Sequence, residues 1–263
     1  MNYTKICEIF RSLALTSGEA IMDIYKNSKF EVLLKSDDSP VTTADKKADE
    51  VILKGLRKYF PEVPVVTEEQ VKSHDLSAPV FFIVDPLDGT KEFIKRRGDF
   101  TVNIALVVNG QPVRGIVYAP ARQRLFYTDE NGEAVEEMAY FSVSKLGLIK
   151  KIKTASSDNT ALKVVASKSH RDKKTDEYIS NYQCKELVNA GSSLKFCLIA
   201  AGEADLYPRF GPTMEWDTAA GHAVLSAAGG SVLQAEDKQP LKYGKPKYKN
   251  PFFIAASKSV ILK

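Results

Sequence analysis

The chain has 263 residues, of which 44% are hydrophobic and 27% are charged. This length and composition suit one large globular core or two abutting subdomains. They exclude a membrane-spanning protein, because no apolar run is long enough to cross a bilayer, and no basic segment followed by a continuous apolar stretch marks a signal peptide. The cysteines are odd in number and lack metal-ligand spacing: Cys7, Cys184 and Cys197. We therefore expect structural thiols and a cytoplasmic location.

The formal net charge is +4, but it is unevenly divided along the chain. Residues 1–145 hold 19 Lys and Arg against 22 Asp and Glu, whereas residues 146–263 hold 18 against 11. An acidic half that holds cations beside a basic half that holds an anion would suit a doubly phosphorylated small molecule. A solvated basic surface is the alternative. The scattered Lys and Arg argue against nucleic-acid binding; the oligomeric state is left open.

The first half begins with helices and continues with strands. Apolar residues recur at helical spacing over residues 5–25 and 43–59, which predicts two amphipathic helices. Short strands are then expected over residues 63–66, 80–84, 101–108, 112–119 and 124–128. The last three should be antiparallel, because Asn109-Gly110 between apolar runs is a strong hairpin signal.

After residue 144 short strands alternate with helices. Strands are expected over residues 164–166, 186–188 and 205–207, near residue 232, and over 252–255. Helices are expected over residues 172–181, 193–201 and 217–228. The first half of the chain is expected to form hairpins, and the second half alternates strands with helices. This order predicts an α/β protein of two stacked, layered subdomains, residues 1–145 and 146–263.

The most informative segment reads D-P-L-D-G-T at residues 85–90. Pro86 cannot continue a central strand ladder, so the chain is expected to turn there. Asp85 and Asp88 can then point into one small volume, where two carboxylates repel unless a cation or a proton lies between them. Oxygen ligands suit Mg²⁺ rather than zinc, and the following glycine and threonine offer an N–H and a hydroxyl to a phosphate. An ordinary Asp-Gly turn is the alternative.

Four further places carry residues suited to the same chemistry. They are Asp45 at the start of the second helix, the pair Glu68 and Glu69 after a short strand, Asp217 before an Ala/Gly-rich helix, and Gly191-Ser192-Ser193 leading into Lys195. Each also has a structural interpretation. The two aspartates suit helix capping, the glutamates suit an exposed loop, and the Gly-Ser-Ser segment suits an ordinary helix start as well as a phosphate site.

Together these segments resemble the inositol monophosphatase superfamily. The matching strings are, in chain order, Thr43-Ala44-Asp45, Thr67-Glu68-Glu69, Asp85 through Thr90, and Trp216-Asp217-Thr218-Ala219-Ala220-Gly221. D-P-[LI]-D-G-T and W-D-x-A-x-G form the double signature of that superfamily, and the resemblance covers nearly the whole chain. Longer strings at residues 85–96, 191–197 and 207–213 resemble its bacterial 3′(2′),5′-bisphosphate nucleotidase branch. The departures, Gln70 and Met214-Glu215, lie outside the expected metal ligands.

The resemblance implies a layered αβαβα sandwich and two or three Mg²⁺ ions. The implied metal ligands are Glu68, Asp85, the carbonyl of Leu87, Asp88 and Asp217. Asp45 and Thr90 are the implied pair that orients the attacking water. The implied substrate contacts are Glu68, Asp88, Gly89, Thr90, His170, Ser192, Lys195, Arg209 and Asp217.

The implied activity is Mg²⁺-dependent removal of the 3′-phosphate of 3′-phosphoadenosine 5′-phosphate to give AMP. This reaction is linked to sulfur assimilation, and the 5′-phosphosulfate form is a second expected substrate. One alternative is an inositol monophosphatase or another sugar phosphatase of the same superfamily. An alternative of another class is an inactive nucleotide-binding regulator. The small-molecule substrate is the expected partner, with at most peripheral attachment to the cytoplasmic face of the inner membrane.

Overall fold

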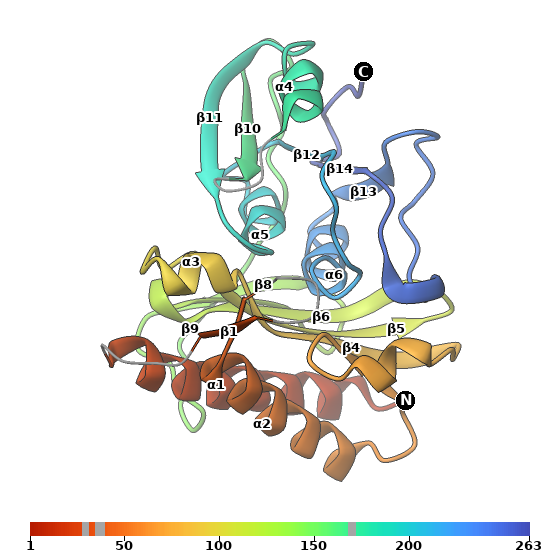
Figure 1. Cartoon of the computed structure of the whole chain (residues 1–263). Helices are drawn as coiled ribbons and strands as arrows, with labels where there is room; N and C mark the ends of the chain where they lie inside the picture. Colours follow the sequence, from red (N-terminus) through yellow and green to blue (C-terminus); the bar gives the residue numbers. More distant parts are fainter. Residues whose placement is uncertain (28–31, 35–39, 168–171) are drawn as a thin grey trace.

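The computed structural model describes residues 1–27, 32–34, 40–167 and 172–263, and these residues stack in layers (Figure 1). From one side to the other the layers are a helix pair, a seven-stranded sheet, a second helix pair, a five-stranded sheet and a single helix. The predicted αβαβα sandwich is therefore confirmed. Among the described residues, no helix combines the length and the apolar character that a membrane span requires.

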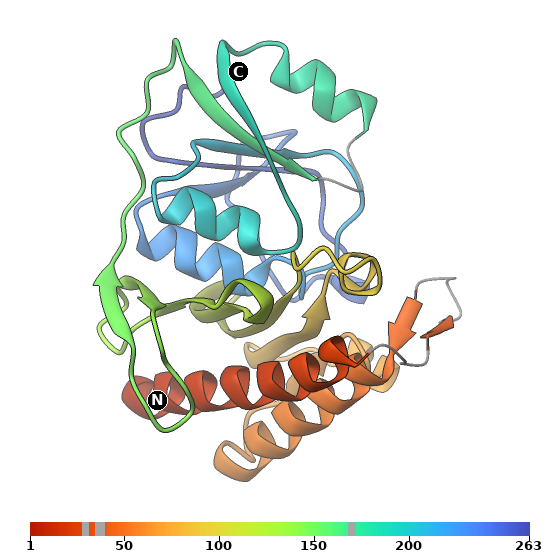
Figure 2. The ribbon, with the colours of Figure 1, turned by 90° about the vertical axis from the view of Figure 1, so that its left-hand side faces the viewer.

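The outer helix pair consists of α1 (Tyr3–Lys26) and α2 (Thr43–Tyr59), which lie side by side on one face of the seven-stranded sheet (Figure 2). Both predicted helices are confirmed. Their buried faces pack on the sheet. For example, Phe10 of α1 meets Phe82 of the sheet edge to face, with ring centroids 5.5 Å apart. Two short antiparallel strands that the sequence did not predict, β1 (Val32–Leu34) and β2 (Pro40–Thr42), precede α2.

The seven-stranded sheet has the order β3-β4-β5-β6-β7-β8-β9. Its strands are β3 (Val65–Thr67), β4 (Val80–Asp88), β5 (Thr101–Val108), β6 (Gln111–Ala119), β7 (Arg124–Thr128), β8 (Ala134–Met138) and β9 (Leu148–Lys151). β3 runs parallel to β4, and every later pair is antiparallel, which confirms the predicted hairpins. Asn109 and Gly110 both have positive φ, as a two-residue hairpin turn requires.

The strand that leads to Asp85 is longer than the sequence suggested. It was expected to end at residue 84 with a turn at Pro86, yet β4 continues to Asp88. Its register with β5 shifts between Asp85 and Asp88, because proline has no N–H for the ladder. The chain turns only at Gly89, whose φ is +94°, and short helix α3 (Thr90–Ile94) follows.

The inner helix pair, α5 (Leu194–Ala200) and α6 (Ala219–Ala227), lies between the two sheets (Figure 2). Gly115 on β6 lets α6 approach closely, because a Cβ at this position would lie 2.6 Å from the backbone oxygen of Ala220 and 2.8 Å from the Cβ of Ala223. The largest hydrophobic cluster fills this middle layer. The start of α6 is thereby held over the first sheet, and Asp217 lies in the segment just before this helix.

The five-stranded sheet has the order β11-β10-β12-β14-β13, and α4 (Lys173–Ile179) covers its far face. Its strands are β10 (Leu162–Ser167), β11 (Cys184–Ala190), β12 (Leu206–Arg209), β13 (Ser231–Gln234) and β14 (Phe253–Ala256). The 3-10 helices η1 (Val71–Asp75), η2 (Pro120–Arg122) and η3 (Pro246–Tyr248) lie in connecting segments. Along the chain, β9 is the last strand of the first sheet and β10 is the first strand of the second. The division into residues 1–145 and 146–263 stays a prediction.

Candidate active site

A pocket of about 320 Å³ is lined by residues from two separate stretches of the chain, 68–92 and 167–218. Its acidic residues are Glu68, Asp85, Asp88, Glu92 and Asp217, and its cationic residues are Lys91, Lys195 and Arg209. Glu69, the second acid of the predicted pair, lines a different hollow along α2. The pocket therefore combines carboxylates suited to cations with cations suited to an anionic ligand.

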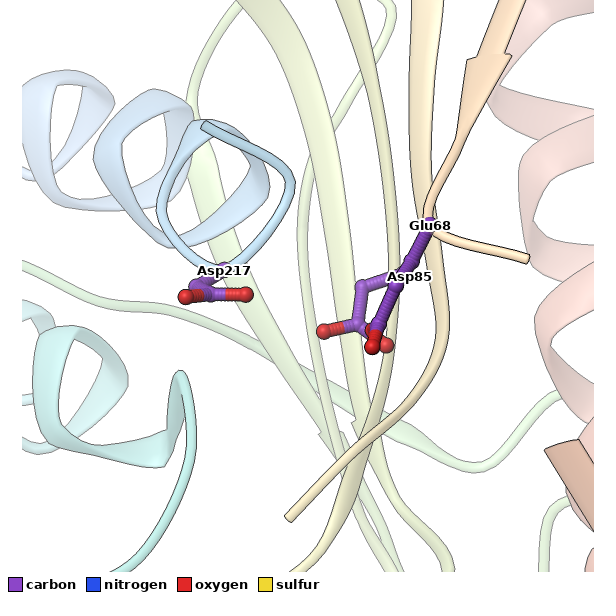
Figure 3. Close-up of side chains that lie close together, drawn as sticks. All are labelled: Glu68, Asp85 and Asp217. Atoms are coloured by element: carbon purple, nitrogen blue, oxygen red, sulfur yellow. The ribbon is translucent and has the colours of Figure 1, made fainter. Parts of the chain in front are cut away.

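Three carboxylates converge in this pocket (Figure 3). Oxygen atoms of Glu68, Asp85 and Asp217 lie within 4.8 Å of one another. Glu68 directly follows β3 and Asp85 lies in the parallel neighbour β4, so the pairing of these strands brings the two together. Asp217 comes from the segment before α6 and faces them from the other side of the pocket (Figure 3).

The pKa values of Asp217 and Asp88 reflect their burial first and the crowding of acids second. Burial, followed by repulsion from Asp88 and Glu68, raises the pKa of Asp217 well above its usual range. Burial likewise raises the pKa of Asp88 to about 6, against the opposing effect of the Lys195 ammonium. Clustered carboxylates of this kind are stabilised in their charged form by a bound cation.

Asp88 is placed differently from the three converging carboxylates. It lines the pocket, but it does not belong to the group whose oxygens lie within 4.8 Å of one another. Its Oδ2 accepts the backbone N–H of Ser193 at 2.7 Å and faces the amide of Asn103 at 3.5 Å. Asp85 uses Oδ1 to accept the N–H of Leu87 at 3.0 Å, which fixes the bulged backbone where the Leu87 carbonyl lies.

Asp45 divides its two carboxylate oxygens between two tasks. Oδ2 accepts the backbone N–H and the hydroxyl of Thr42, at 2.7 and 2.6 Å, and so closes a capping box at the start of α2. Oδ1 accepts the Thr90 hydroxyl at 3.1 Å. The capping interpretation is thus confirmed, and the same carboxylate also reaches the pocket residue Thr90. Burial of Asp45 raises its pKa above the usual range.

The segment before α5 joins the two halves of the pocket. Gly89 has no room for a side chain, because a Cβ there would lie 2.3 Å from the Ser192 hydroxyl oxygen. That hydroxyl lies 2.8 Å from the backbone oxygens of both Asp88 and Asp99. The Ser193 hydroxyl donates to the backbone oxygen of Asp217 at 2.5 Å. Ser192 and Ser193 therefore connect the D-P-L-D-G-T segment to the start of α6.

Two cations are buried beside the acids. Lys195 is 5% exposed, donates to the backbone oxygen of Ser192 at 2.7 Å and lies 5.1 Å from the ring centroid of Tyr207. Burial lowers its pKa to about 8, although Asp88 opposes the shift. Arg209 is 8% exposed and donates to the backbone oxygen of Pro212 at 2.9 Å. Both side chains line the pocket, where an anion would be attracted to them.

The remaining predicted site residue, His170, lies outside the described residues. Asp88 is contacted by Ser193, which belongs to the predicted Gly191-Ser192-Ser193 segment, and by Asn103, which the motifs did not indicate. Asn103 pairs with Asp85 in the β4–β5 register and is 1% exposed. An amide inside the otherwise apolar run 102–108 is the signal that would have revealed it, since a buried polar side chain needs a partner.

The fold and the acidic pocket define a class of metal-dependent phosphatase, and comparison with known proteins agrees. The family model described as "Inositol monophosphatase family" matches residues 2–262. The chain therefore belongs to the inositol monophosphatase family. The solved inositol monophosphatase from Anabaena shares the fold, with a TM-score of 0.75 at 23% identity over 98% of this chain and 92% of that one.

Within the family, the chain is similar to bacterial proteins named 3′(2′),5′-bisphosphate nucleotidase CysQ. The CysQ of Salmonella typhimurium is 44% identical over 252 residues, which cover 95% of this chain and 97% of the relative. The CysQ of Haemophilus influenzae is 31% identical, over 92% and 89% of the two chains. The crystal structure of CysQ from Bacteroides thetaiotaomicron has a TM-score of 0.84 at 39% identity, over 97% and 98% of the two chains.

Enzymes of this family depend on metal ions, and the residues present fit that requirement. The donor set consists of carboxylate oxygens, which suit hard divalent cations rather than softer metals. Burial, followed by repulsion from Asp88 and Glu68, raises the pKa of Asp217, so the pocket without a cation disfavours the charged form of this side chain. A divalent cation would remove that penalty.

Proposed function

We propose that this protein is a Mg²⁺-dependent 3′(2′),5′-bisphosphate nucleotidase that converts 3′-phosphoadenosine 5′-phosphate to AMP and phosphate, with a role in sulfur assimilation. The observation that carries the proposal is the meeting of three carboxylates, Glu68, Asp85 and Asp217, in one pocket with Lys195 and Arg209. The similarity to CysQ proteins over almost the full chain supports the choice of substrate.

Two or three Mg²⁺ ions would be held by the acidic residues. The proposed ligands are Glu68, Asp85, the carbonyl of Leu87, Asp88 and Asp217. When bound, such ions polarise the phosphoryl oxygens and lower the pKa of a coordinated water. The Oδ2 atom of Asp88 accepts the Ser193 N–H, and this bond would hold the carboxylate in place while it contacts a metal.

Asp45 and Thr90 would orient the attacking water and move its proton. The Thr90 hydroxyl donates to Asp45, so its oxygen can accept a hydrogen bond from water. As the water oxygen bonds to phosphorus, its proton passes through the hydroxyl to Asp45. The bond from phosphorus to the 3′-oxygen breaks, and this oxygen keeps the bonding electrons and takes a proton from solvent to become the 3′-hydroxyl of AMP. The raised pKa of Asp45 makes its carboxylate a stronger base than an exposed aspartate.

The cationic residues would recognise the second phosphate. Lys195 and Arg209 are almost fully buried and line the same pocket as the acids, so a charge-assisted contact to the 5′-phosphate would form with little competition from water. The backbone around Gly89 and Ser192 would contact the transferred phosphate and the ribose. With this division of the pocket, a bisphosphate would make more charge-assisted contacts than a sugar with one phosphate.

A side-by-side hydrolysis assay tests the proposal. Purified protein with Mg²⁺ is incubated separately with 3′-phosphoadenosine 5′-phosphate, its 5′-phosphosulfate form, inositol 1-phosphate and fructose 1,6-bisphosphate, and phosphate release is measured. A parallel series with EDTA is the control. We expect the adenosine bisphosphate to give the highest kcat/KM and AMP as the nucleotide product, with no release in EDTA.

Two outcomes would contradict the proposal. Faster hydrolysis of inositol 1-phosphate would assign the chain to the sugar-phosphate branch of the family. Tight binding of the adenosine bisphosphate without any turnover would instead support an inactive nucleotide-binding regulator.

A further inference from the structure

The segment that carries Glu68 has little backbone support. β3 has three residues and lies at the edge of the sheet, so among the described strands it pairs only with β4. After Thr67, the backbone N–H of Glu68 donates to the backbone oxygen of Val84 at 3.2 Å. The backbone N–H of Gln70 donates to the backbone oxygen of Thr67 at 3.3 Å and closes a turn. The position of the Glu68 side chain therefore depends on side-chain anchors around this turn.

Asp49 on α2 provides such an anchor. Its side chain is buried, and the residue is 2% exposed. Oδ1 accepts the Thr67 hydroxyl at 2.6 Å, and Oδ2 accepts the Gln70 side-chain amide at 2.8 Å. These two donors lie immediately before and immediately after the Glu68-Glu69 pair. A buried carboxylate is costly unless it is hydrogen-bonded, so both bonds should hold the turn firmly.

The same helix carries Asp45, four residues before Asp49. Residues at this spacing share one face of an α-helix, and both side chains are buried. One rigid element thus contacts Thr90 through Asp45 and the Glu68 turn through Asp49. The spacing between the proposed base and the proposed metal ligand is set by this helix.

We propose that Asp49 is a positioning residue of the active site, which fixes Glu68 relative to Asp45 by bonding both ends of the Glu68-Glu69 turn. This inference rests on the proposed function in one respect, since it takes Glu68 as a metal ligand. Asp49 itself contacts neither metal nor substrate in this scheme. Loss of partners that orient a metal ligand typically weakens metal binding about 10- to 100-fold.

Two substitutions separate the anchor from the negative charge. Asp49→Ala removes both acceptors. Asp49→Asn removes the charge but keeps Oδ1 for the Thr67 hydroxyl, and its amide can donate to Gln70 once the Gln70 amide is reversed. An anchor role predicts that the asparagine variant resembles the wild type, whereas a purely electrostatic role predicts that it resembles the alanine variant.

The experiment is a calorimetric titration of metal-free protein with Mg²⁺, without substrate, together with circular dichroism and thermal unfolding. It compares the wild type, D49A, D49N and a control, Glu50→Ala, which removes an exposed acid from the next position of the same helix. We expect D49A to weaken Mg²⁺ binding at least about tenfold, while D49N and E50A stay within about threefold of the wild type. Phosphate release is measured on the same samples.

Folded D49A with the Mg²⁺ affinity of the wild type would overturn the inference, and so would D49N that is as weak as D49A. If D49A does not fold, Thr67→Val and Thr67→Ser decide instead. Valine removes the hydroxyl that donates to Asp49, whereas serine keeps it. Only the valine variant should therefore lose Mg²⁺ affinity.

Failure of the proposed function would look different. A wild type that binds Mg²⁺ but does not hydrolyse the adenosine bisphosphate would refute the nucleotidase activity alone, because the Mg²⁺ titration would still report on Asp49. An active wild type whose D49A variant binds Mg²⁺ normally would refute the positioning role alone.

Discussion

The Thr90 hydroxyl lies 3.1 Å from Oδ1 of Asp45, while Oδ2 of the same carboxylate caps the helix that carries it. One side chain therefore has a structural and a proposed catalytic task, and each task uses its own oxygen. Mutation of Asp45 would disturb both, because loss of a helix cap typically costs about 1 kcal/mol. Thr90 offers the cleaner test.

Thr90→Val removes the hydroxyl and keeps the shape of the side chain. We expect kcat for the adenosine bisphosphate to fall about 100-fold or more, since positioned proton transfer contributes about 10²- to 10⁴-fold. KM and the melting temperature should change little. Thr90→Ser restores the hydroxyl and should recover most of the lost kcat. A valine variant with the kcat of the wild type would exclude the relay.

Lys195→Met tests recognition of the second phosphate. Methionine keeps the length of the side chain but removes the ammonium that lies in the pocket. We expect kcat/KM to fall about 10- to 100-fold more for 3′-phosphoadenosine 5′-phosphate than for adenosine 3′-monophosphate, because a hydrogen bond to a charged group contributes about 1.5–3 kcal/mol. The ratio of the two substrates cancels any general effect on the metals. An unchanged ratio would show that Lys195 does not contact the 5′-phosphate.

His222 makes the stability of the fold depend on pH. It is buried on α6, its Nδ1 lies 2.9 Å from the Tyr243 hydroxyl, and that hydroxyl donates to Thr218. Burial lowers the pKa of His222 from its usual 6.5 to about 3. Between these values the unfolded chain binds a proton that the folded chain does not. The contribution of His222 to stability is therefore complete above pH 6.5 and declines as the pH falls toward 3.

This dependence is measured by urea unfolding of the wild type and His222→Gln at pH 7 and pH 5. Glutamine does not titrate in this range. The stability advantage of the wild type should shrink by about 2 kcal/mol between the two pH values, at about 1.4 kcal/mol per pH unit below 6.5. A constant difference between the two proteins would show that His222 titrates normally in the folded state.

Gly115→Ala tests the contact that sets the height of α6 above the first sheet. The added Cβ would meet backbone atoms of Ala220, which cannot rotate away. We expect a loss of about 1–3 kcal/mol in unfolding free energy and weaker Mg²⁺ binding, because Asp217 lies just before this helix. Chemical denaturation and Mg²⁺ titration check the two effects. A variant of full stability would show that the helix shifts without penalty.

Much of the fold could be predicted because hydrophobic periodicity marks it locally. The helix over residues 43–59 and the hairpin at Asn109-Gly110 were found at their observed positions. β8 was missed because it contains Glu136 and Glu137, which do not suit a buried strand. Their charges are paired with Arg124 and Arg11, and these partners come from other elements. A pattern along the chain does not reveal such pairs.

In the site, too, contacts between distant segments could not be predicted from the sequence. The motifs predicted the acids that meet in the pocket, since the order of the motifs along the chain is itself informative. Asn103, which contacts Asp88, and Asp49, which contacts the residues beside Glu68, belong to no motif and act through bonds to distant segments. Asp49 in particular reads in the sequence as one more polar residue of an amphipathic helix. Only the folded arrangement shows that it bonds both ends of the Glu68 turn.

The most direct test of the account is the Mg²⁺ dependence of phosphate release from 3′-phosphoadenosine 5′-phosphate by the wild type and by Asp85→Asn. Asp85 is 1% exposed and belongs to the group of three converging carboxylates. The account predicts activity that rises with Mg²⁺ and vanishes in EDTA for the wild type, and a loss of at least about 100-fold for the folded asparagine variant. Undiminished turnover by this variant, or by the wild type in EDTA, would contradict it.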